Sequence, residues 1–157
     1  MNDPRWLDQR ELTAWRAFLE SSAILNRQVE QQLKDEAGLS HPQYEVLARL
    51  SGAPGGELRM TELAGAALTS KSGLTYQVGQ LEKAGLVRRR SCDTDVRGVI
   101  AGLTEAGWAK LRATSPGHAA LVRELFVDGL DRARFSTLAD GLEALAAHLR
   151  ETAGRRD

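Results

Sequence analysis

Apolar residues in the first 37 positions recur at spacings of three and four, the repeat of one face of an α-helix. The residues on this face are Leu12, Trp15, Phe18, Leu19, Leu25, Val29 and Leu33. The pattern predicts one long helix over residues 7–37. Asp8 and Glu11 have the spacing of a capping box at its start, and Gly38 is a favourable stop.

Shorter elements follow this first helix. Ser40 is a good N-cap for a second helix, which has Pro42 near its first turn. Its inward-facing residues are expected to be Tyr44, Val46, Leu47 and Leu50. The Pro- and Gly-rich residues 53–56 predict a loop, and residues 58–60 a short strand.

Residues 58–103 have the most informative pattern of the chain. A helix from Thr61 through Leu68 is interrupted at Thr69 and Ser70, and Ser70 caps the next helix. Further on, the pattern predicts that helix over residues 71–84, a stop at Gly85, strands over residues 86–91 and 99–103, and a polar loop over residues 92–98. This order is a helix-turn-helix followed by a β-hairpin wing, the elements of a module that reads duplex DNA.

The remaining residues are predicted to be helical. Thr104 caps a fifth helix, which Pro116 should kink or restart because proline lacks a backbone donor. A last helix is expected over residues 131–152, followed by a polar tail over residues 153–157. The predicted fold class is therefore mainly α with a small β-hairpin wing.

The helix over residues 71–84 has two different faces. Leu74, Val78 and Leu81 form a narrow apolar stripe on a helical wheel. The opposite and flanking positions are occupied by Ser72, Gly73, Thr75, Tyr76, Gly79, Gln80 and Lys83. Hydroxyl, amide and phenol groups can hydrogen-bond base edges in the major groove, and the helix N-terminus at Ser70 and Lys71 can bind a phosphate. The alternative is a surface helix whose polar side is merely solvated.

The predicted wing carries the arginines of this segment. Strand alternation sends Arg89 to one face and Arg88 and Arg90 to the other, and an arginine fork matches phosphate oxygens. Arg97 in the loop is placed to enter the narrow minor groove, where the potential is most negative. Asp93 or Asp95 could hold its guanidinium. The alternative is an ordinary charged hairpin loop.

Net charge by itself argues against a nucleic-acid binder, since 21 basic and 21 acidic residues cancel. The distribution changes this picture. Residues 59–97 contain seven basic and four acidic residues, a net charge of +3, whereas residues 1–40 have a net charge of −2. The basic excess therefore lies on the segment that would face phosphates.

Composition excludes several other classes. No apolar run approaches the roughly 18 residues that a membrane span requires, and the N-terminus lacks a signal-peptide core. The single Cys92 can form neither an internal disulfide nor a thiolate cage, which favours a cytoplasmic location. Three histidines and scattered carboxylates show no nucleophile elbow, phosphate loop or metal-ligand spacing. We therefore expect no catalytic residues, no metal, no cofactor and no enzymatic activity.

Four segments of the chain resemble the MarR family of winged-helix transcriptional regulators. They are LRMTELA, SKSGLTYQVGQLEKAGLVRR, the D-x-D-x-R-G wing and LTEAG. With the flanking helices, the resemblance covers nearly the whole chain. It implies a homodimer in which residues 1–38 and 104–152 supply dimerisation helices and residues 40–103 form a winged helix-turn-helix lobe that binds double-stranded DNA. Two recognition helices would then meet a pseudo-palindromic operator about one DNA turn, ~34 Å, apart.

The resemblance and the residue pattern together give a set of candidate DNA-binding residues. They are Ser70, Lys71, Ser72, Thr75, Tyr76, Gln77, Arg89 and Arg97. The wheel places Gln77 only partly outward. Gly73, Gln80 and Val96 stand where family members often have a basic residue, so weaker phosphate binding is expected.

Many members of this family bind small, often aromatic, acids between the dimer helices and the DNA-binding lobe. The candidate ligand-binding residues here are Trp15, Arg16, His41, Trp108 and His118, with ordinary packing or solvation as the alternative for each. The predicted function is a sequence-specific dimeric regulator, a repressor relieved by such a small-molecule effector. The competing hypothesis is a degenerate winged helix that associates with proteins and does not bind specific DNA.

Overall fold

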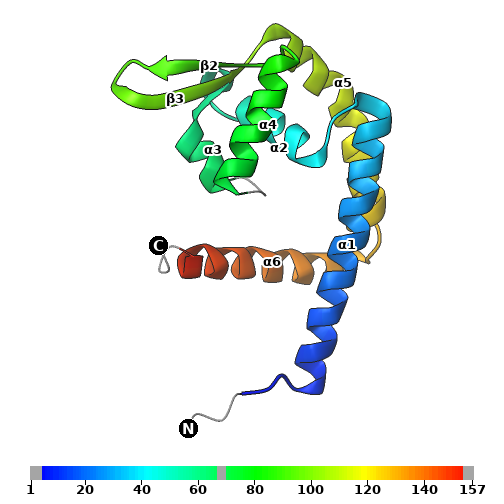
Figure 1. Ribbon diagram of the computed structural model, residues 1–157. Helices are drawn as coiled ribbons and strands as arrows, with labels where there is room; N and C mark the ends of the chain where they lie inside the picture. Colours follow the sequence, from blue (N-terminus) through cyan, green and yellow to red (C-terminus); the bar gives the residue numbers. More distant parts are fainter. Residues whose placement is uncertain (1–4, 67–69, 154–157) are drawn as a thin grey trace. The chain divides into compact units, whose positions relative to one another are not determined.

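The computed structural model describes residues 5–66 and 70–153 and divides into two compact units, residues 1–119 and 120–157 (Figure 1). The helices are α1 (Gln9–Ala37), α2 (His41–Ser51), α3 (Met60–Ala66), α4 (Lys71–Lys83), α5 (Glu105–Val122) and α6 (Arg132–Ala153), and the strands are β1 (Glu57–Arg59), β2 (Val87–Cys92) and β3 (Asp95–Leu103). A 3-10 turn covers Pro54–Gly56 and a π-helical turn covers Arg123–Val127. The expected end of the third helix at Leu68, the break at Thr69 and most of the expected tail lie outside the described residues.

Local signals determine where the long helices begin and end. Asp8 Oδ1 accepts the Glu11 backbone N–H at 2.8 Å, and Glu11 Oε2 accepts the Asp8 backbone N–H at 2.8 Å, so the predicted capping box is confirmed. Gly38 ends α1 with a φ of 65°, a conformation that favours glycine. Ser40 and Gln43 form a second capping box at the start of α2.

The core of the first unit lies between the helices and a three-stranded antiparallel sheet of order β1-β3-β2. The largest fully buried side chains are Leu33, Leu47, Leu50, Leu63, Leu74, Val78, Leu81 and Val87. Only the last third of α1 contributes buried residues, Val29 and Leu33. The prediction of a mainly α fold with a small β-hairpin wing is confirmed, and the hairpin extends past α3 and α4 (Figure 1).

A tight connection joins the recognition segment to α5. The Leu86 backbone N–H donates to the Leu81 carbonyl, and Gly85 adopts a φ of 75°. Thr104 Oγ1 donates to the Gly85 carbonyl at 2.6 Å and accepts the Gly107 backbone N–H at 3.0 Å. A Cβ at Gly107 would collide with the Leu86 carbonyl, so only glycine fits there. These contacts fix the end of α4 against the start of α5.

Three sequence predictions are wrong in detail. The polar loop expected over residues 92–98 shrinks to Asp93 and Thr94, because β2 and β3 continue pairing to Cys92 and Asp95. The first strand is shifted by one residue from the prediction and ends at Arg59. Pro116 lies inside α5 without restarting it, since one missing backbone donor leaves the hydrogen bonds of the neighbouring turns in place.

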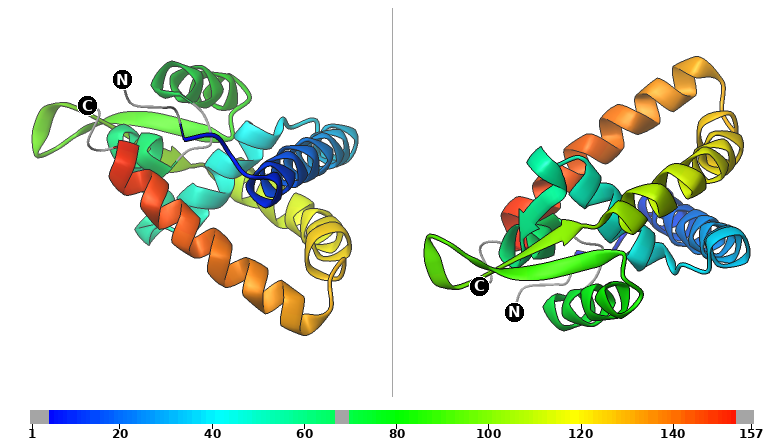
Figure 2. Two further views of the ribbon diagram at one scale, coloured as in Figure 1. Left: turned by 90° about the horizontal axis from the view of Figure 1, so that it is seen from below. Right: turned by 90° about the horizontal axis from the view of Figure 1, so that it is seen from above.

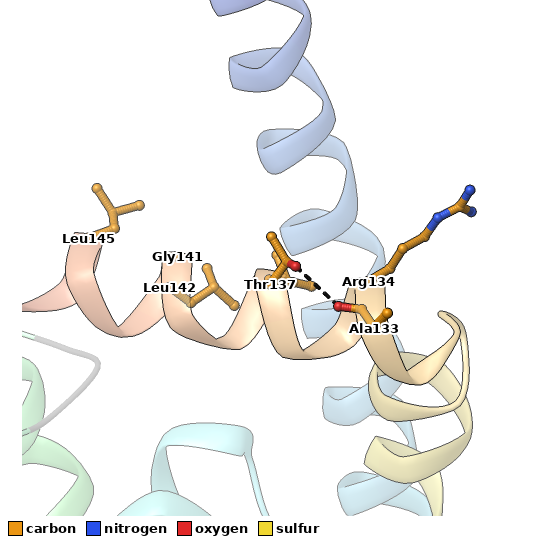
Figure 3. A pocket seen from close by; sticks show the side chains of 7 residues that line it. Ala133, Arg134, Thr137, Gly141, Leu142 and Leu145 are labelled. Atoms are coloured by element: carbon orange, nitrogen blue, oxygen red, sulfur yellow. Dashed lines mark hydrogen bonds between the residues drawn. The ribbon is translucent and has the colours of Figure 1, made fainter.

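The second unit consists of the end of α5, the π-helical turn and α6. Phe126 and Phe135 pack edge to face with ring centroids 5.7 Å apart, and Asp131 Oδ1 accepts the Arg134 backbone N–H at 2.9 Å. A shallow, mostly apolar groove runs along α6 (Figure 3), lined by Ala133, Arg134, Thr137, Leu138, Gly141, Leu142 and Leu145. In the described part of the chain, no helix is long and apolar enough to cross a membrane. The division into dimerisation helices and a DNA-binding lobe stays a prediction.

Candidate DNA interface

Helix α4 has the two faces that its sequence predicts. Leu74, Val78 and Leu81 are buried, whereas Lys71, Ser72, Thr75 and Tyr76 are exposed. The Tyr76 side chain is 62% exposed, an unusually large aromatic surface for a helix with a packed inner face. The outer face is therefore available to a macromolecular partner.

The polar groups at the start of α4 are partly committed to the helix itself. Ser70 Oγ accepts the Gly73 backbone N–H at 3.1 Å, and Thr75 Oγ1 donates to the Lys71 carbonyl at 3.0 Å. The Thr75 oxygen keeps lone pairs that can accept a hydrogen bond from a base. Gln77 is half-buried, as the wheel indicated, and its Oε1 is buried without a partner in the described part of the chain.

A groove of about 440 Å³ separates α4 from the wing. It is lined by Arg59, Met60, Thr61, Thr75, Arg89, Asp95, Arg97, Gly98 and Val99. The fold thus brings together Thr75, Arg89 and Arg97, three of the residues selected from the sequence. Helix α4 and the hairpin lie side by side in both views of Figure 2. Sequence reasoning missed Arg59, Met60 and Thr61, because their place in the groove depends on the pairing of β1 with β3.

Arg89 does not point freely into this groove. Its Nη2 lies 2.9 Å from Glu82 Oε1, its Nε lies 3.3 Å from Glu82 Oε2, and its backbone N–H also donates to that carboxylate. The hydrogen bond from Arg89 lowers the pKa of Glu82, which keeps the carboxylate ionised. The predicted alternation of the wing strand is confirmed, but the positive charge of Arg89 is offset within the molecule. Its contact with a phosphate stays a prediction.

The other face of the hairpin carries a second ion-pair cluster. Arg88 Nη2 and Arg90 Nη2 lie 3.3 Å and 2.8 Å from the two oxygens of Glu57. Glu57 belongs to the opposite edge strand, and Gly102 lies between it and Arg88 in the sheet register. A Cβ at Gly102 would come within 2.9 Å of the Glu57 side chain. Glycine in the central strand therefore leaves the space through which the carboxylate reaches both arginines.

The wing tip departs from regular pairing. Ser91 pairs with Val99, but Cys92 pairs with Asp95, so residues 96–98 lie outside the ladder. Asp95 Oδ1 accepts the backbone N–H of Arg97 at 3.0 Å. The hypothesis that Asp93 or Asp95 holds the Arg97 guanidinium is wrong.

The carboxylates of the wing tip pair with other arginines instead. Asp93 lies 3.7 Å from Arg90, and Asp95 lies 3.8 Å from Arg59. No carboxylate in the described ranges lies within 4.0 Å of Arg97. The exposed Arg97 side chain is thus available to an external anion.

The candidate ligand-binding residues separate into three places. His41, His118 and the intervening Tyr44 are neighbours, with the His118 ring centroid 4.4 Å from that of Tyr44 and 6.3 Å from that of His41. Trp108 packs instead against Gly56 beneath the 3-10 turn. Trp15 and Arg16 are exposed on α1, where Trp15 stacks on Phe18 at 5.9 Å.

The histidine cluster contains partly buried titratable groups. Burial, and then the neighbouring His41, lower the pKa of His118, and its Nδ1 is buried without a partner in the described residues. Glu45 Oε1 lies 3.8 Å from His41 Nε2, and this neighbouring imidazole lowers the pKa of the carboxyl. Within residues 5–66 and 70–153, no group of three or more His, Cys, Asp or Glu side chains is placed to hold a metal ion.

Comparison with known proteins identifies the family. A model described as the MarR family matches residues 37–98. The structure of Sco3205 from Streptomyces coelicolor, a MarR family transcriptional regulator in complex with DNA, is 38% identical, with a TM-score of 0.89 over 95% of this chain and 93% of that one. The chain belongs to the MarR family. This regulator is also similar to AbsC from Streptomyces coelicolor, with 41% identity and a TM-score of 0.87 over 94% of this chain and 99% of that one.

A curated relative agrees with this assignment. The HTH-type transcriptional repressor YetL of Bacillus subtilis (strain 168) is 30% identical over 112 residues, which is 71% of this chain and 66% of YetL. This MarR family protein is therefore a DNA-binding transcriptional regulator, and its relatives are regulators rather than enzymes. The family resemblance expected from the sequence is confirmed.

Proposed function

We propose that this MarR family protein is a homodimeric repressor of transcription that reads a pseudo-palindromic operator and is released by a small ligand. The observation that carries the DNA-reading part is the groove in which Thr75 of α4 and Arg97 of the wing lie together beside an exposed polar helix face. A helix and an arginine-bearing hairpin so placed can enter a major groove and the adjacent minor groove of one duplex.

The proposed contacts divide into two kinds. Thr75 and Tyr76 read base edges, because both are exposed on α4, and half-buried Gln77 contributes through the part of its side chain that faces outward. Ser70, Lys71 and Ser72 bind phosphate at the helix N-terminus, where backbone donors and the helix dipole favour an anion. The two kinds of contact have different effects on binding, since base contacts determine the preferred sequence and phosphate contacts increase affinity for every duplex.

Exposed apolar residues support the proposed homodimer. Trp15 is 50% exposed, Phe18 and Ile24 are each 46% exposed, and Leu145 and Leu149 of α6 are 43% and 55% exposed. Large apolar side chains on two long helices are unfavourable in water, and burying them against a second copy would remove that cost. Dimers are typical of the family, and two copies would supply the paired recognition helices that a palindromic site requires.

The similarity to the repressor YetL supports repression, and the histidine cluster supports the proposed ligand. His41, Tyr44 and His118 combine an aromatic wall with groups that can donate to an acid. A ligand that binds there preferentially in a conformation with mismatched recognition helices would shift the population away from DNA. We expect benzoate, as a probe of this chemistry, to weaken operator binding, and His118→Phe to abolish that effect without changing DNA affinity itself. Equal sensitivity of both proteins to benzoate would contradict the assignment of this site.

The DNA-binding proposal is tested with the purified protein and the duplex upstream of its own coding region at several salt concentrations. Binding that weakens as salt rises is expected because phosphate contacts release counterions. Arg97→Ala should weaken binding to all duplexes. Arg112→Ala, which removes an equal charge from an exposed position on α5, should have much less effect. Absence of binding at any low salt concentration, with recovery of a protein partner, would instead favour the protein-association alternative.

A further inference from the structure

A side chain from outside the hairpin contacts the wing tip. Arg59 lies at the end of β1, and its Nη2 donates to Thr94 Oγ1 at 3.1 Å, while its Nη1 lies 3.8 Å from Asp95 Oδ2. Thr94 is the second residue of the two-residue turn of the wing, and Asp95 follows the turn. One guanidinium on the opposite edge strand therefore touches both residues that shape the tip.

Strand pairing does not position Arg97. The register shift between Ser91 and Cys92 leaves residues 96–98 outside the ladder, so regular cross-strand pairing does not fix their backbone. Val96, next to Arg97, is 100% exposed and has no packing contact to hold it. The Arg97 backbone N–H instead donates to Asp95 Oδ1 at 3.0 Å.

The carboxylate of Asp95 connects Arg59 to Arg97. One carboxylate oxygen faces the Arg59 guanidinium, and the other accepts the Arg97 N–H at 3.0 Å. Holding one oxygen fixes the plane of the carboxylate and with it the direction of the second hydrogen bond. The tip is supported from beneath as well, because Cys92 Sγ lies 3.3 Å from Thr94 Oγ1 and a Cβ at Gly98 would come within 2.9 Å of Cys92 Cβ.

We propose that Arg59 is a positioning residue for DNA binding, which acts through Asp95 and Thr94 to hold Arg97 in the orientation that enters the minor groove. This inference rests on the proposed contact of Arg97 with DNA. In this role Arg59 does not have to contact a DNA phosphate itself, since its N–H donors are directed at the wing tip. The same arrangement gives Asp95 a positive contribution to DNA binding, although its charge repels phosphate.

The sign of the effect at position 95 separates this role from simple electrostatics. Asp95→Asn removes a negative charge near DNA, so charge alone predicts tighter binding. The proposal predicts binding weaker by about tenfold, the scale of losing one well-placed arginine contact. Arg59→Lys keeps the charge at position 59 but cannot bridge Thr94 and Asp95 with a planar fork, so it should weaken binding to a similar extent.

The experiment measures operator affinity of the full-length protein by fluorescence anisotropy, with thermal unfolding of each variant as a folding control. Asp95→Asn and Arg59→Lys are made in the wild-type background and in the Arg97→Ala background. Each should weaken binding about tenfold in the first and change it less than about twofold in the second, because residues that act through one contact are not additive. Hydroxyl-radical footprints should show the same loss of minor-groove protection in each single variant as in Arg97→Ala.

Four results would overturn the proposal, and they differ in what they reject. Tighter binding by Asp95→Asn, or wild-type affinity of Arg59→Lys, would show that Arg59 acts only as a charge, while the contact of Arg97 with DNA would stand. Equal losses in both backgrounds would show that Arg59 binds DNA directly. If Arg97→Ala itself leaves affinity unchanged, the wing contact of the proposed function fails, and the inference fails with it.

Discussion

Glu82→Gln tests how the ion pairs of the DNA-binding lobe limit its attraction to phosphate. Of the seven basic residues in residues 59–97, four have a carboxylate within 4.0 Å: Arg59, Arg88, Arg89 and Arg90. Within the described residues, the remaining three have none: Lys71, Lys83 and Arg97. The net charge of +3 therefore does not show where the free positive charge lies. Most arginines of this segment are already paired, so the unpaired charge is confined to three residues.

The magnitude follows from this count. Three unpaired cations per chain, or six in a dimer, give a slope of log affinity against log salt of about −5 if each neutralises one phosphate. Glu82→Gln keeps an oxygen that can accept the Arg89 backbone N–H but releases the guanidinium. Adding one cation per chain should steepen the slope to about −7. Between 50 and 200 mM salt the variant should then lose about tenfold more affinity than the wild type.

The assay is a salt titration of binding to a random-sequence duplex by fluorescence anisotropy, from about 50 to 200 mM salt. Glu143→Gln is the matched control, because it removes the same charge from an exposed position on α6. Its slope should match that of the wild type. An unchanged slope in Glu82→Gln would contradict this expectation, since it would mean that Arg89 either contacts phosphate despite Glu82 or cannot reach the DNA.

Two further predictions concern the free protein. Gly79→Ala should stabilise the protein by about 0.5–1 kcal/mol in urea unfolding, because nothing lies within 4 Å of the added Cβ and alanine favours a helix. Gly107→Ala should have the opposite effect and destabilise the protein by about 2 kcal/mol or more, since its Cβ would meet the Leu86 carbonyl. Equal effects of the two substitutions would contradict the packing described around α5. His118 has a pKa below its ordinary value in the folded protein, so its contribution to stability is complete above about pH 6.5 and is lost as pH falls below it. Unfolding free energy measured from pH 7 to pH 5 should fall more steeply for the wild type than for His118→Asn, and parallel curves would rule out this role.

The parts of the fold that the sequence predicts well are those determined by neighbours along the chain. The capping box of Asp8 and Glu11, the αL stop at Gly38 and the buried stripe of α4 each depend on residues three or four positions apart. Such local signals determine where helices begin and which side they bury. They account for the agreement over most of the helical structure.

The parts that the sequence did not predict depend on contacts between distant segments. Glu57 and Arg88 are 31 residues apart, and they meet only because both pair through β3 across Gly102. Arg59 and Thr94 are 35 residues apart. Alternation along one strand shows which face an arginine occupies but not which carboxylate lies opposite. The distribution of paired and unpaired charges on the DNA-binding lobe therefore required the structure.

In the proposed function, the outer face of α4 reads base sequence while the wing adds affinity without reading it. Selection of bound sequences from a random duplex library, at one fixed salt concentration, tests this with wild type, Tyr76→Ala and Arg97→Ala. Tyr76→Ala should change the preferred base at defined positions of each half-site, whereas Arg97→Ala should keep the preferred sequence and lower affinity for all duplexes. The same preferred sequence in wild type and Tyr76→Ala, with a changed sequence in Arg97→Ala, would contradict it.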